Sequence, residues 1–309
     1  MKLNDLVTNP SLRHDFLMLF DVQDGNPNGD PDAGNMPRVD PETMHGLVTD
    51  VCIKRKIRDY VDQTRGSEER FKIYIQNKGI ALNDLHQRAY DALGIKSSGQ
   101  KQNRNEVNQA RQWMCNNFYD IRMFGAVMTT GVNCGQVRGP MQLTFARSIT
   151  PITPLDVSIT RVAITRPEDA QVVSGENDRE EGKGKVTEMG RKALLPYGLY
   201  LGKGFFSPKF AEDTGVTPED LVLFWEALQN MWDLDRSASR GFMNLRGLYV
   251  FTHDNAIGRA PAHKLFDLVR ASLNPGVESP RSFADYTVEV PPEGPVDGFE
   301  GVTLTRLVG

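Results

Sequence analysis

The order of elements predicted along this 309-residue chain indicates an α+β fold built on a ferredoxin-like sheet. An apolar strand at 15–22 precedes a long amphipathic helix, alternating strands follow, and a second helix beginning at Thr217 precedes the last strands. The stretch 63–138 interrupts this order and has mostly helical patterning. We therefore expect it to be an insertion into the sheet domain.

The first strand and the first helix are predicted from two periodicities. Residues 15–22 are apolar on both faces, which indicates a strand that is covered on both sides. After a polar, turn-rich loop, Asp40 can cap a helix whose first residue is Pro41. Apolar residues then recur at helical spacing and predict an amphipathic helix over 41–62. They are Met44, Leu47, Val48, Val51, Ile57, Tyr60 and Val61.

The inserted stretch contains two weaker helical patterns. One covers 83–93, with Asn83 as its cap and Gly94 as its end, and the other covers 104–118. Beyond the insertion, alternating side chains predict strands at 141–146 and at 160–165. The following segment, 174–185, is rich in glycine and charge. It cannot bury a core, so we expect an exposed hairpin tip or a disordered finger there.

The remaining elements have clear local signals. A strand is predicted at 197–206, and Thr217-Pro-Glu-Asp then opens a helix with a hydroxyl cap, proline at the first position and an acid at the third. The last predicted elements are strands at 247–252, 285–290 and 301–307 and a short helix at 263–271.

Charge is distributed unevenly along the chain. The formal net charge of −4 alone argues against binding nucleic acid or an anionic membrane. However, residues 45–150 carry a net charge of +7, whereas the segments 1–44, 151–270 and 271–309 are all net negative. Lys54-Arg55-Lys56-Ile57-Arg58 places several cations on one helix, where phosphates would relieve their mutual repulsion. A solvated helix face with Asp59 and Asp62 as partners is the simpler alternative.

Neither a membrane segment nor a metal site is expected. Asp5 near the start and the short early apolar run 16–20 argue against a secretory signal and a membrane span. The three cysteines, Cys52, Cys115 and Cys134, are widely spaced and are predicted to be reduced thiols in a cytoplasmic protein. The five histidines have no short ligand spacing. We expect no cofactor.

The loop at 24–35 has three interpretations. Its D-x-N-x-N-G pattern fits the start of a calcium loop, but the twelfth position is Asn35 instead of glutamate, and a strand precedes it where an EF-hand has a helix. The simplest interpretation is a system of turns formed by Asx and glycine residues. Alternatively, Gly25 and Gly29 allow main-chain N–H groups to approach a phosphate.

Two further glycine-containing fragments are incomplete motifs. Gly198-Leu-Tyr-Leu-Gly202-Lys203-Gly204 is one residue short of a phosphate-binding loop and lacks its Ser or Thr. Lys203-Gly-Phe-Phe and Arg246-Gly-Leu-Tyr-Val-Phe match only part of the RNA-recognition signature. A stacking platform of aromatic side chains on the sheet is therefore not predicted.

Taken together, several motifs resemble one family. They are FDVQDGNPNGDPD at 20–32, VTDVCIKRKIR at 48–58, DIRMFGAVM at 120–128, GQVRGPMQLTFARS at 135–148, LPYGLYLGKGFFSP at 195–208 and DRSASRG at 235–241. In these segments the chain resembles the backbone subunit of the type I-C CRISPR Cascade complex, a member of the repeat-associated mysterious protein superfamily. The resemblance covers nearly the whole chain.

The resemblance implies a fold and a function. The fold would be a palm of modified RNA-recognition type at 1–62 and 139–309, helical fingers at 63–138, and a thumb hairpin at 160–192. Copies would stack head to tail along CRISPR guide RNA, each thumb displacing one guide base, and would present the other bases to target DNA beside other Cascade subunits. Such a subunit is not an enzyme, because guide–target base pairing reads the sequence.

The resemblance and the charge pattern together give a set of candidate RNA-binding residues, with Met189 as the candidate thumb wedge. The set is Asn26, Asn28, Arg38, Thr49, Lys54, Arg55, Arg58, Arg138, Gln142, Arg236, Ser237 and Arg240. An endoribonuclease of the same superfamily is the alternative. It would use His45, or Asp30 or Asp32 of the loop, as general acid or base.

Overall fold

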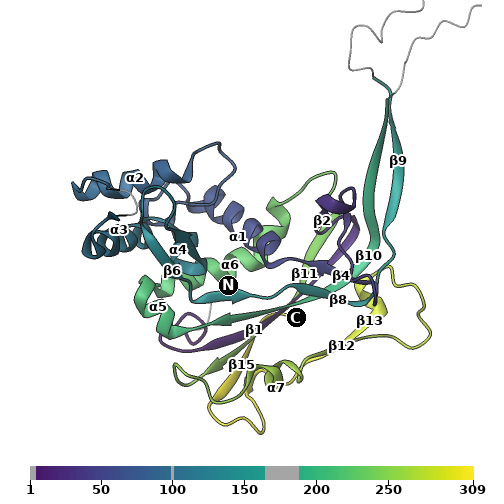
Figure 1. Ribbon diagram of the computed structural model, residues 1–309. Coiled ribbons are helices and arrows are strands. Elements are labelled where there is room, and N and C mark those ends of the chain that lie inside the picture. Colours follow the sequence, from purple (N-terminus) through teal and green to yellow (C-terminus); the bar gives the residue numbers. More distant parts are fainter. Residues whose placement is uncertain (1–4, 99–100, 164–187) are drawn as a thin grey trace, which may run out of the picture.

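The computed structural model describes residues 5–98, 101–163 and 188–309 and confirms the α+β class (Figure 1). In these residues the main sheet has the order β14-β15-β11-β1-β10-β8-β4, and β7 and β9 also pair with β10. All of its strand pairs are antiparallel. The central strands are β1 (His14–Gly25), β8 (Ala146–Pro151), β10 (Glu188–Phe206) and β11 (Phe242–His253), and the outer ones are β4 (His45–Val48), β7 (Met141–Leu143), β9 (Leu155–Arg161), β14 (Gly294–Pro295) and β15 (Val302–Val308).

The predicted ferredoxin-like order is present at the centre of this sheet. Along the chain, β1 is followed by helix α1 (Asp50–Arg65), then by β8 and β10, then by helix α6 (Pro218–Leu234) and β11. Their spatial order is β11-β1-β10-β8, so the first strand lies between the third and the fourth. This is the β-α-β-β-α-β arrangement that the sequence predicted.

The predicted helix over 41–62 is wrong in its first part. Residues His45–Val48 form β4, which pairs with β8, and Met44 has a positive φ of 57°. Helix α1 begins only at Asp50, where the Thr49 side chain accepts a hydrogen bond from the Cys52 amide. Thr49, not Asp40, is therefore the N-cap, because strand pairing with a distant segment outweighs the local signal at Pro41.

The prediction for α6 is confirmed. Thr217 and Asp220 form a capping box, with Pro218 as the first helical residue. The buried face of α6 packs on β1 through aromatic contacts. Trp225 lies 5.1 Å from Phe16 and Trp232 lies 4.7 Å from Phe20, measured between ring centroids. Helices α1 and α6 thus cover the same face of the sheet (Figure 1).

The opposite face of the sheet is covered mainly by the C-terminal part of the chain. Leu17 and Leu19 of β1 lie beneath helix α7 (Ala262–Phe266) and the hairpin of β12 (Arg270–Leu273) and β13 (Tyr286–Glu289). The helix predicted at 263–271 is therefore too long, because Arg270 already belongs to β12.

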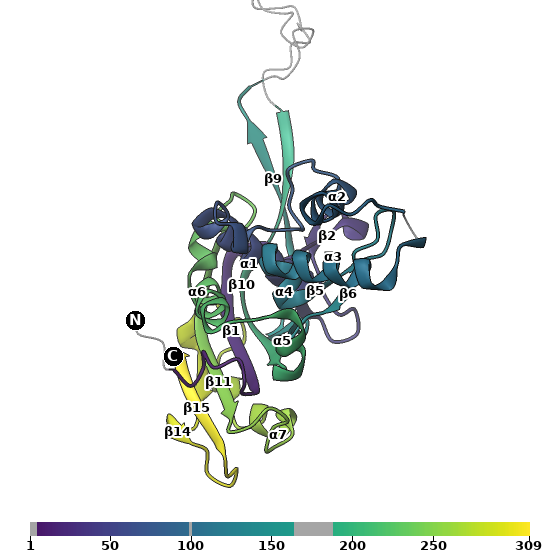
Figure 2. The ribbon, with the colours of Figure 1, turned by 90° about the vertical axis from the view of Figure 1, so that its left-hand side faces the viewer.

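A second core lies within the stretch 71–138. It is built by α2 (Leu82–Leu93), α3 (Arg104–Asn117), α4 (Tyr119–Phe124), β5 (Gly125–Met128) and β6 (Gly135–Arg138), and Tyr90 and Met114 are fully buried in it. Gly94 ends α2 as predicted, but Ala81 instead of Asn83 occupies the N-cap. The short helix α5 (Pro208–Thr214) lies against this segment (Figure 2). Three 3₁₀ turns, Pro31–Ala33, Glu69–Phe71 and Phe283–Asp285, and the short strand pair of β2 (Gly29–Asp30) and β3 (Met36–Pro37) complete the described elements.

Two buried carboxylates join this helical segment to the sheet domain. Asp220 of α6 pairs with Arg122 at 2.6 Å and with Arg70 at 2.8 Å. Burial alone would raise the pKa of the Asp220 carboxyl, but the hydrogen bonds and charge of Arg122 outweigh it and lower that pKa. Asp120 of α4 accepts from Arg58 of α1 at 2.7 Å and from the amide of Tyr74 at 2.8 Å.

A long hairpin of β9 and β10 projects from the body of the protein (Figures 1 and 2). The strand predicted at 160–165 begins earlier, at Leu155, and its last two residues and the predicted tip at 174–185 lie outside the described residues. The strand predicted at 141–146 is interrupted at residues 144–145, which separate β7 from β8, although the Thr144 amide still donates to the Lys203 carbonyl of β10. None of the described helices is long and apolar enough to cross a membrane.

His14 gives the fold a testable pH dependence. Its side chain is buried between Thr252 and Asn9, and burial lowers its pKa to about 4 from an ordinary 6.5. Between these values the unfolded chain binds more protons than the folded one. Stability is therefore full above pH 6.5 and falls as the pH drops to 4, by on the order of 2–3 kcal/mol. Urea unfolding across this range measures the loss. His14→Gln should flatten the profile, whereas the exposed His263→Gln should not, and equal profiles for both variants would contradict the assignment.

Candidate nucleic-acid interface

A close backbone crossing brings the end of β1 next to the turn at 239–241. The Asn26 amide donates to the Ser239 carbonyl at 2.7 Å. A Cβ on Gly25 would lie 2.0 Å from the Arg240 carbonyl oxygen. A Cβ on Gly241, whose φ is 62°, would lie 2.4 Å from a backbone oxygen of β1. Glycine is therefore required at both positions, and the two candidate segments 24–35 and 235–241 lie side by side.

The loop that follows β1 is attached to the N-terminus of α1. The Asn28 side-chain oxygen accepts from the Thr49 amide at 2.9 Å and from the Thr49 hydroxyl at 3.0 Å. Thr49 in turn caps α1. The loop therefore lies at the positive end of the helix macrodipole, where a phosphate is favoured.

Other side chains of the loop are used to hold its shape. The Asn26 side-chain amide donates to the Asn35 carbonyl at 2.7 Å, and the Asn26 side chain is nearly inaccessible. The Arg38 amide donates to the Asn28 carbonyl, and its guanidinium lies 3.3 Å from Asp30. The Arg38 side chain is 31% exposed, so its positive charge still reaches the surface.

The cations of α1 have different surroundings. Arg55 is 63% exposed and lies 3.7 Å from Asp59, a weak surface pair. Lys54 is 13% exposed, pairs with Asp50 at 2.9 Å and lies over the ring of Phe124. Arg58 is 11% exposed and is held by the buried Asp120. Its guanidinium joins α1 to the helical segment, and we leave it out of the interface.

The segment 235–241 contributes two more cations. Arg240 donates to the Asn26 carbonyl at 3.2 Å and lies 3.3 Å from Asp235, so its guanidinium links the loop to the end of α6. Arg236 pairs with Asp233 and packs on the ring of Phe242 at 4.9 Å, and it is 38% exposed. The Ser237 hydroxyl is exposed and shares a hydrogen bond with Ser239.

Arg138 and Gln142 contact other elements. Arg138 is exposed on β6 and stacks on Phe210 of α5 at 4.3 Å. Gln142 is exposed on β7 and donates to the Gly139 carbonyl at 2.9 Å. No hydrogen bond or ion pair of the described residues joins either side chain to the loop.

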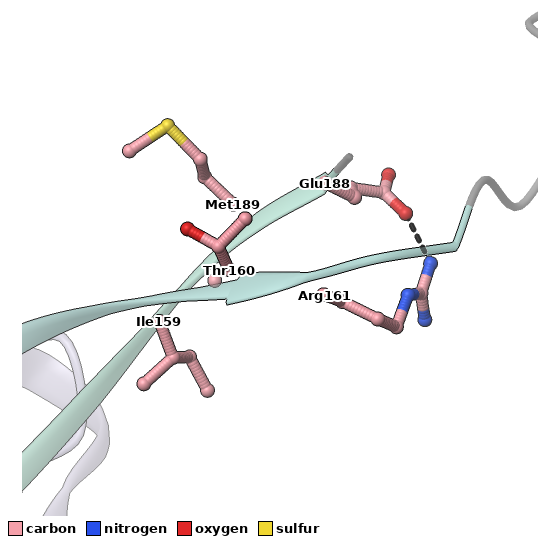
Figure 3. A pocket seen from close by; sticks show the side chains of 6 residues that line it. Ile159, Thr160, Arg161, Glu188 and Met189 are labelled. Carbon is pink, nitrogen blue, oxygen red and sulfur yellow. Dashed lines mark hydrogen bonds and ion pairs between the residues drawn. The ribbon is translucent and has the colours of Figure 1, made fainter. Parts of the chain in front are cut away.

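Met189 lies near the described end of the projecting hairpin. Its side chain is 74% exposed. Figure 3 shows it on one side of the hairpin together with Thr160, whereas Ile159 points to the other side. Arg161 and Glu188 form an ion pair across the two strands.

The catalytic and calcium-binding alternatives fit the geometry poorly. The Nδ1 atom of His45 lies 2.7 Å from the Ser148 carbonyl, and no hydrogen bond of the described residues joins His45 to Asp30 or Asp32. Asp30 caps a 3₁₀ turn and pairs with Arg38, so its carboxylate is already engaged in holding the loop. Within the described residues no cluster of His, Cys, Asp or Glu could hold a metal.

Sequence reasoning missed several residues that shape this region. Lys56 is nearly fully buried, pairs with Asp235 and lies over the Trp232 ring. Phe124 packs under both Lys54 and Arg58. The only signal for Lys56 was its place on the apolar side of α1 beside Ile53 and Ile57, which argues for burial.

Comparison with known proteins identifies the family. The model of a family described as "CRISPR-associated protein Cas7" matches residues 12–291. The chain belongs to the Cas7 family. A Cas7-family protein of Haloferax volcanii, described as "CRISPR-associated protein Cas7", is 26% identical over 241 residues, which cover 71% of this chain. This chain spans only 64% of the length of that relative.

Two solved structures resemble this Cas7-family chain more distantly. One is described as "CRISPR RNA-guided surveillance complex" and has 14% sequence identity and a TM-score of 0.44. The match covers 77% of this chain and 68% of that chain. The other is described as "CRISPR RNA-guided surveillance complex, pre-nicking" and has 13% sequence identity and a TM-score of 0.46. The match covers 77% of this chain and 78% of that chain.

Gly25→Ala tests the backbone crossing. The added Cβ would meet a backbone oxygen that cannot rotate away, so we expect a loss of about 1–3 kcal/mol in stability and weaker RNA binding. Urea unfolding and RNA filter binding measure the two effects. Gly34→Asn in the same loop is the control, because nothing lies near a Cβ there and asparagine tolerates its positive φ. A Gly25→Ala variant as stable as the control would contradict the crossing.

Proposed function

We propose that this Cas7-family chain is the non-catalytic backbone subunit of a type I-C Cascade complex in the cytoplasm. Copies stack head to tail along CRISPR guide RNA, hold its backbone and present its bases to target DNA beside other Cascade subunits. The observation that carries the proposal is the assembly of the 24–38 loop, the N-terminus of α1 and the 235–241 segment into one polar surface. We call this surface the loop–helix surface.

The electrostatics of the loop–helix surface suit a phosphate backbone. Its cations are Arg38, Lys54, Arg55, Arg236 and Arg240, and each pairs with an acid on the same surface. The pairs of Arg55 and Arg236 are exposed, and such pairs contribute less than about 1 kcal/mol, so a phosphate can replace the acid there at small cost. The backbone groups around Asn26, Asn28 and Thr49 orient the loop, and Arg138 and Gln142 would add RNA contacts outside the loop–helix surface.

The two cores support the division into parts. We assign 1–62 and 139–309 to a palm and 63–138 to fingers, with the thumb at 160–192. The helical segment has its own buried cluster, and the projecting hairpin has Leu155, Val157 and Ile159 exposed on one face. Such an apolar face favours contact with a neighbouring copy. The type I-C assignment rests on the six sequence motifs.

A structural role also agrees with the chemistry of the surface. Base pairing supplies the sequence specificity of a guide complex, so its protein needs only to hold the backbone shape. The hydrogen bonds of His45, Asp30 and Asp32 serve strands and turns, which gives the endoribonuclease alternative no acid–base pair.

Arg55→Ala tests the phosphate contact. We expect weaker guide binding. The slope of the logarithm of the binding constant against the logarithm of the salt concentration should become smaller in magnitude by about 0.7 for each subunit contact, because one phosphate is no longer neutralised. Titration of labelled guide RNA at several salt concentrations measures the slope. Lys209→Ala is the matched control, since Lys209 is also exposed and paired on its helix with Glu212. Equal slopes for the two variants would count against the loop–helix surface.

Met189→Ala tests the thumb wedge. In guide-loaded complexes paired with target, a wedge should leave regularly spaced guide bases unpaired and reactive toward a base-specific chemical probe. The alanine variant should keep the RNA but lose this periodic reactivity, since the displacing side chain is gone. Val127→Ala, another exposed apolar truncation, should leave the pattern intact. An unchanged pattern in Met189→Ala would exclude Met189 as the wedge.

A further inference from the structure

On the sheet face opposite α1 and α6, the described residues include an opening between β8, β10 and β12. It has a volume of about 650 Å³ and is lined by Phe145, Arg147, Ile149, Leu201, Lys203 and Ala271. Leu201 is directly opposite Arg147 in the register of β10 and β8, so these side chains share a face. This face is opposite to the one that α1 and α6 cover, since Tyr200 beside Leu201 stacks on Phe20 among the helices. The opening is thus separate from the loop–helix surface.

The opening occurs beside the RNA-recognition fragment Lys203-Gly-Phe-Phe. In RNA-recognition domains, aromatic side chains on the exposed sheet face stack on bases. Here Phe205 is half-buried and packs on Phe266 of α7 at 5.7 Å between ring centroids, so it cannot receive a base. Lys203, two residues earlier on the same face, remains exposed. The part of the sheet face that stays open is therefore the row that contains Lys203.

Phe145 is an exposed aromatic side chain at the same opening, and its ring is accessible to a base, unlike that of Phe205. It follows Thr144, whose amide is bound to the Lys203 carbonyl at 2.9 Å, and this bond fixes Phe145 beside Lys203. The phenyl side chain is 52% exposed although Leu201 and Ile149 provide an apolar floor next to it. An exposed aromatic ring with a cation beside it is the combination that binds single-stranded nucleic acid through stacking and phosphate attraction.

The two cations of the opening differ in how their charge is compensated. Arg147 pairs with Asp40 at 3.0 Å, and this hydrogen bond holds the pKa of Asp40 below its ordinary value. Lys203 has no ion pair within the described residues and lies 5.7 Å from the centre of the Phe266 ring. Lys203 therefore supplies the free positive charge, next to the exposed ring.

We propose that this opening binds a nucleotide of single-stranded DNA, with the base stacked on Phe145 and the adjacent phosphate beside Lys203. The inference rests on the proposed function, because pairing of the guide with duplex DNA releases one DNA strand. The guide and its paired target would occupy the loop–helix surface on the other face, which leaves this opening to the displaced strand. A volume of about 650 Å³ is in the usual range for a site that takes one small ligand.

The test uses the guide-loaded complex, in which RNA already fills the loop–helix surface. Anisotropy of a fluorescent oligo(dT) measures binding of single-stranded DNA, and oligo(dT) with 5-iododeoxyuridine maps the contact by photocrosslinking. We expect a crosslink to Phe145, about tenfold weaker binding for Phe145→Ala, and retained binding for Phe145→Trp. Lys203→Gln should reduce the magnitude of the salt dependence of DNA binding, measured as the slope of log binding constant against log salt concentration, by about 0.7.

Matched variants separate the proposal from its alternatives. Phe145→Leu keeps an apolar side chain without the ring, so it should bind as weakly as the alanine variant. Ile257→Ala, an exposed truncation elsewhere, should bind like the unmodified complex. The proposal is overturned if Phe145→Leu binds DNA normally, if the crosslink lies elsewhere, or if Phe145→Ala disrupts only assembly with a protein partner. Failure of the proposed function would appear differently, as loss of guide RNA from the purified complex.

Discussion

The placement of the helical segment against the sheet domain depends on two buried carboxylates. Asp120 and Asp220 are each almost inaccessible to water, and each is compensated by arginine from a different element. A buried charge without its partner costs about 3–5 kcal/mol, so these pairs tolerate little relative movement of the elements that they join. They fix α1 and α6 against the helical segment and thereby fix the direction in which the other cations of α1 point.

The candidate interface depends in turn on a backbone-to-backbone contact at Gly25 and Gly241. Gly25 and Gly241 let two backbone segments approach to a distance at which any Cβ would collide with a backbone oxygen. Arg240 can then reach the carbonyl groups at the start of the loop, and Asn28 can reach Thr49. The positive end of α1, the loop and the 235–241 segment meet for this reason, although more than 180 residues separate Thr49 from Asp235.

How much of this the sequence could predict depends on the range of the interactions concerned. Helix α6 was predictable because its capping box lies within four consecutive residues. The start of α1 was not, because the local cap signal at Asp40 and Pro41 is overridden by pairing of β4 with β8, about 100 residues away. For the candidate site, motifs and charge singled out the segments 20–32, 48–58 and 235–241, and the structure brings these three together. The sequence could not show which cations of α1 are buried and paired. The partner of Arg58 lies 62 residues away along the chain, and that of Lys56 lies 179 residues away.

The acids on the loop–helix surface explain how a chain with a net charge of −4 could still hold RNA. Arg55, Arg236 and Lys54 each have a carboxylate partner three or four residues away in the sequence. These pairs keep the RNA-free surface nearly neutral and so limit repulsion between neighbouring cations. Because each exposed pair is weak, a phosphate competes with the carboxylate at small cost, while any single contact adds little affinity. Under the proposed function, strong binding then comes from many contacts in a row, which a repeated subunit along a continuous RNA would provide and an isolated copy would not.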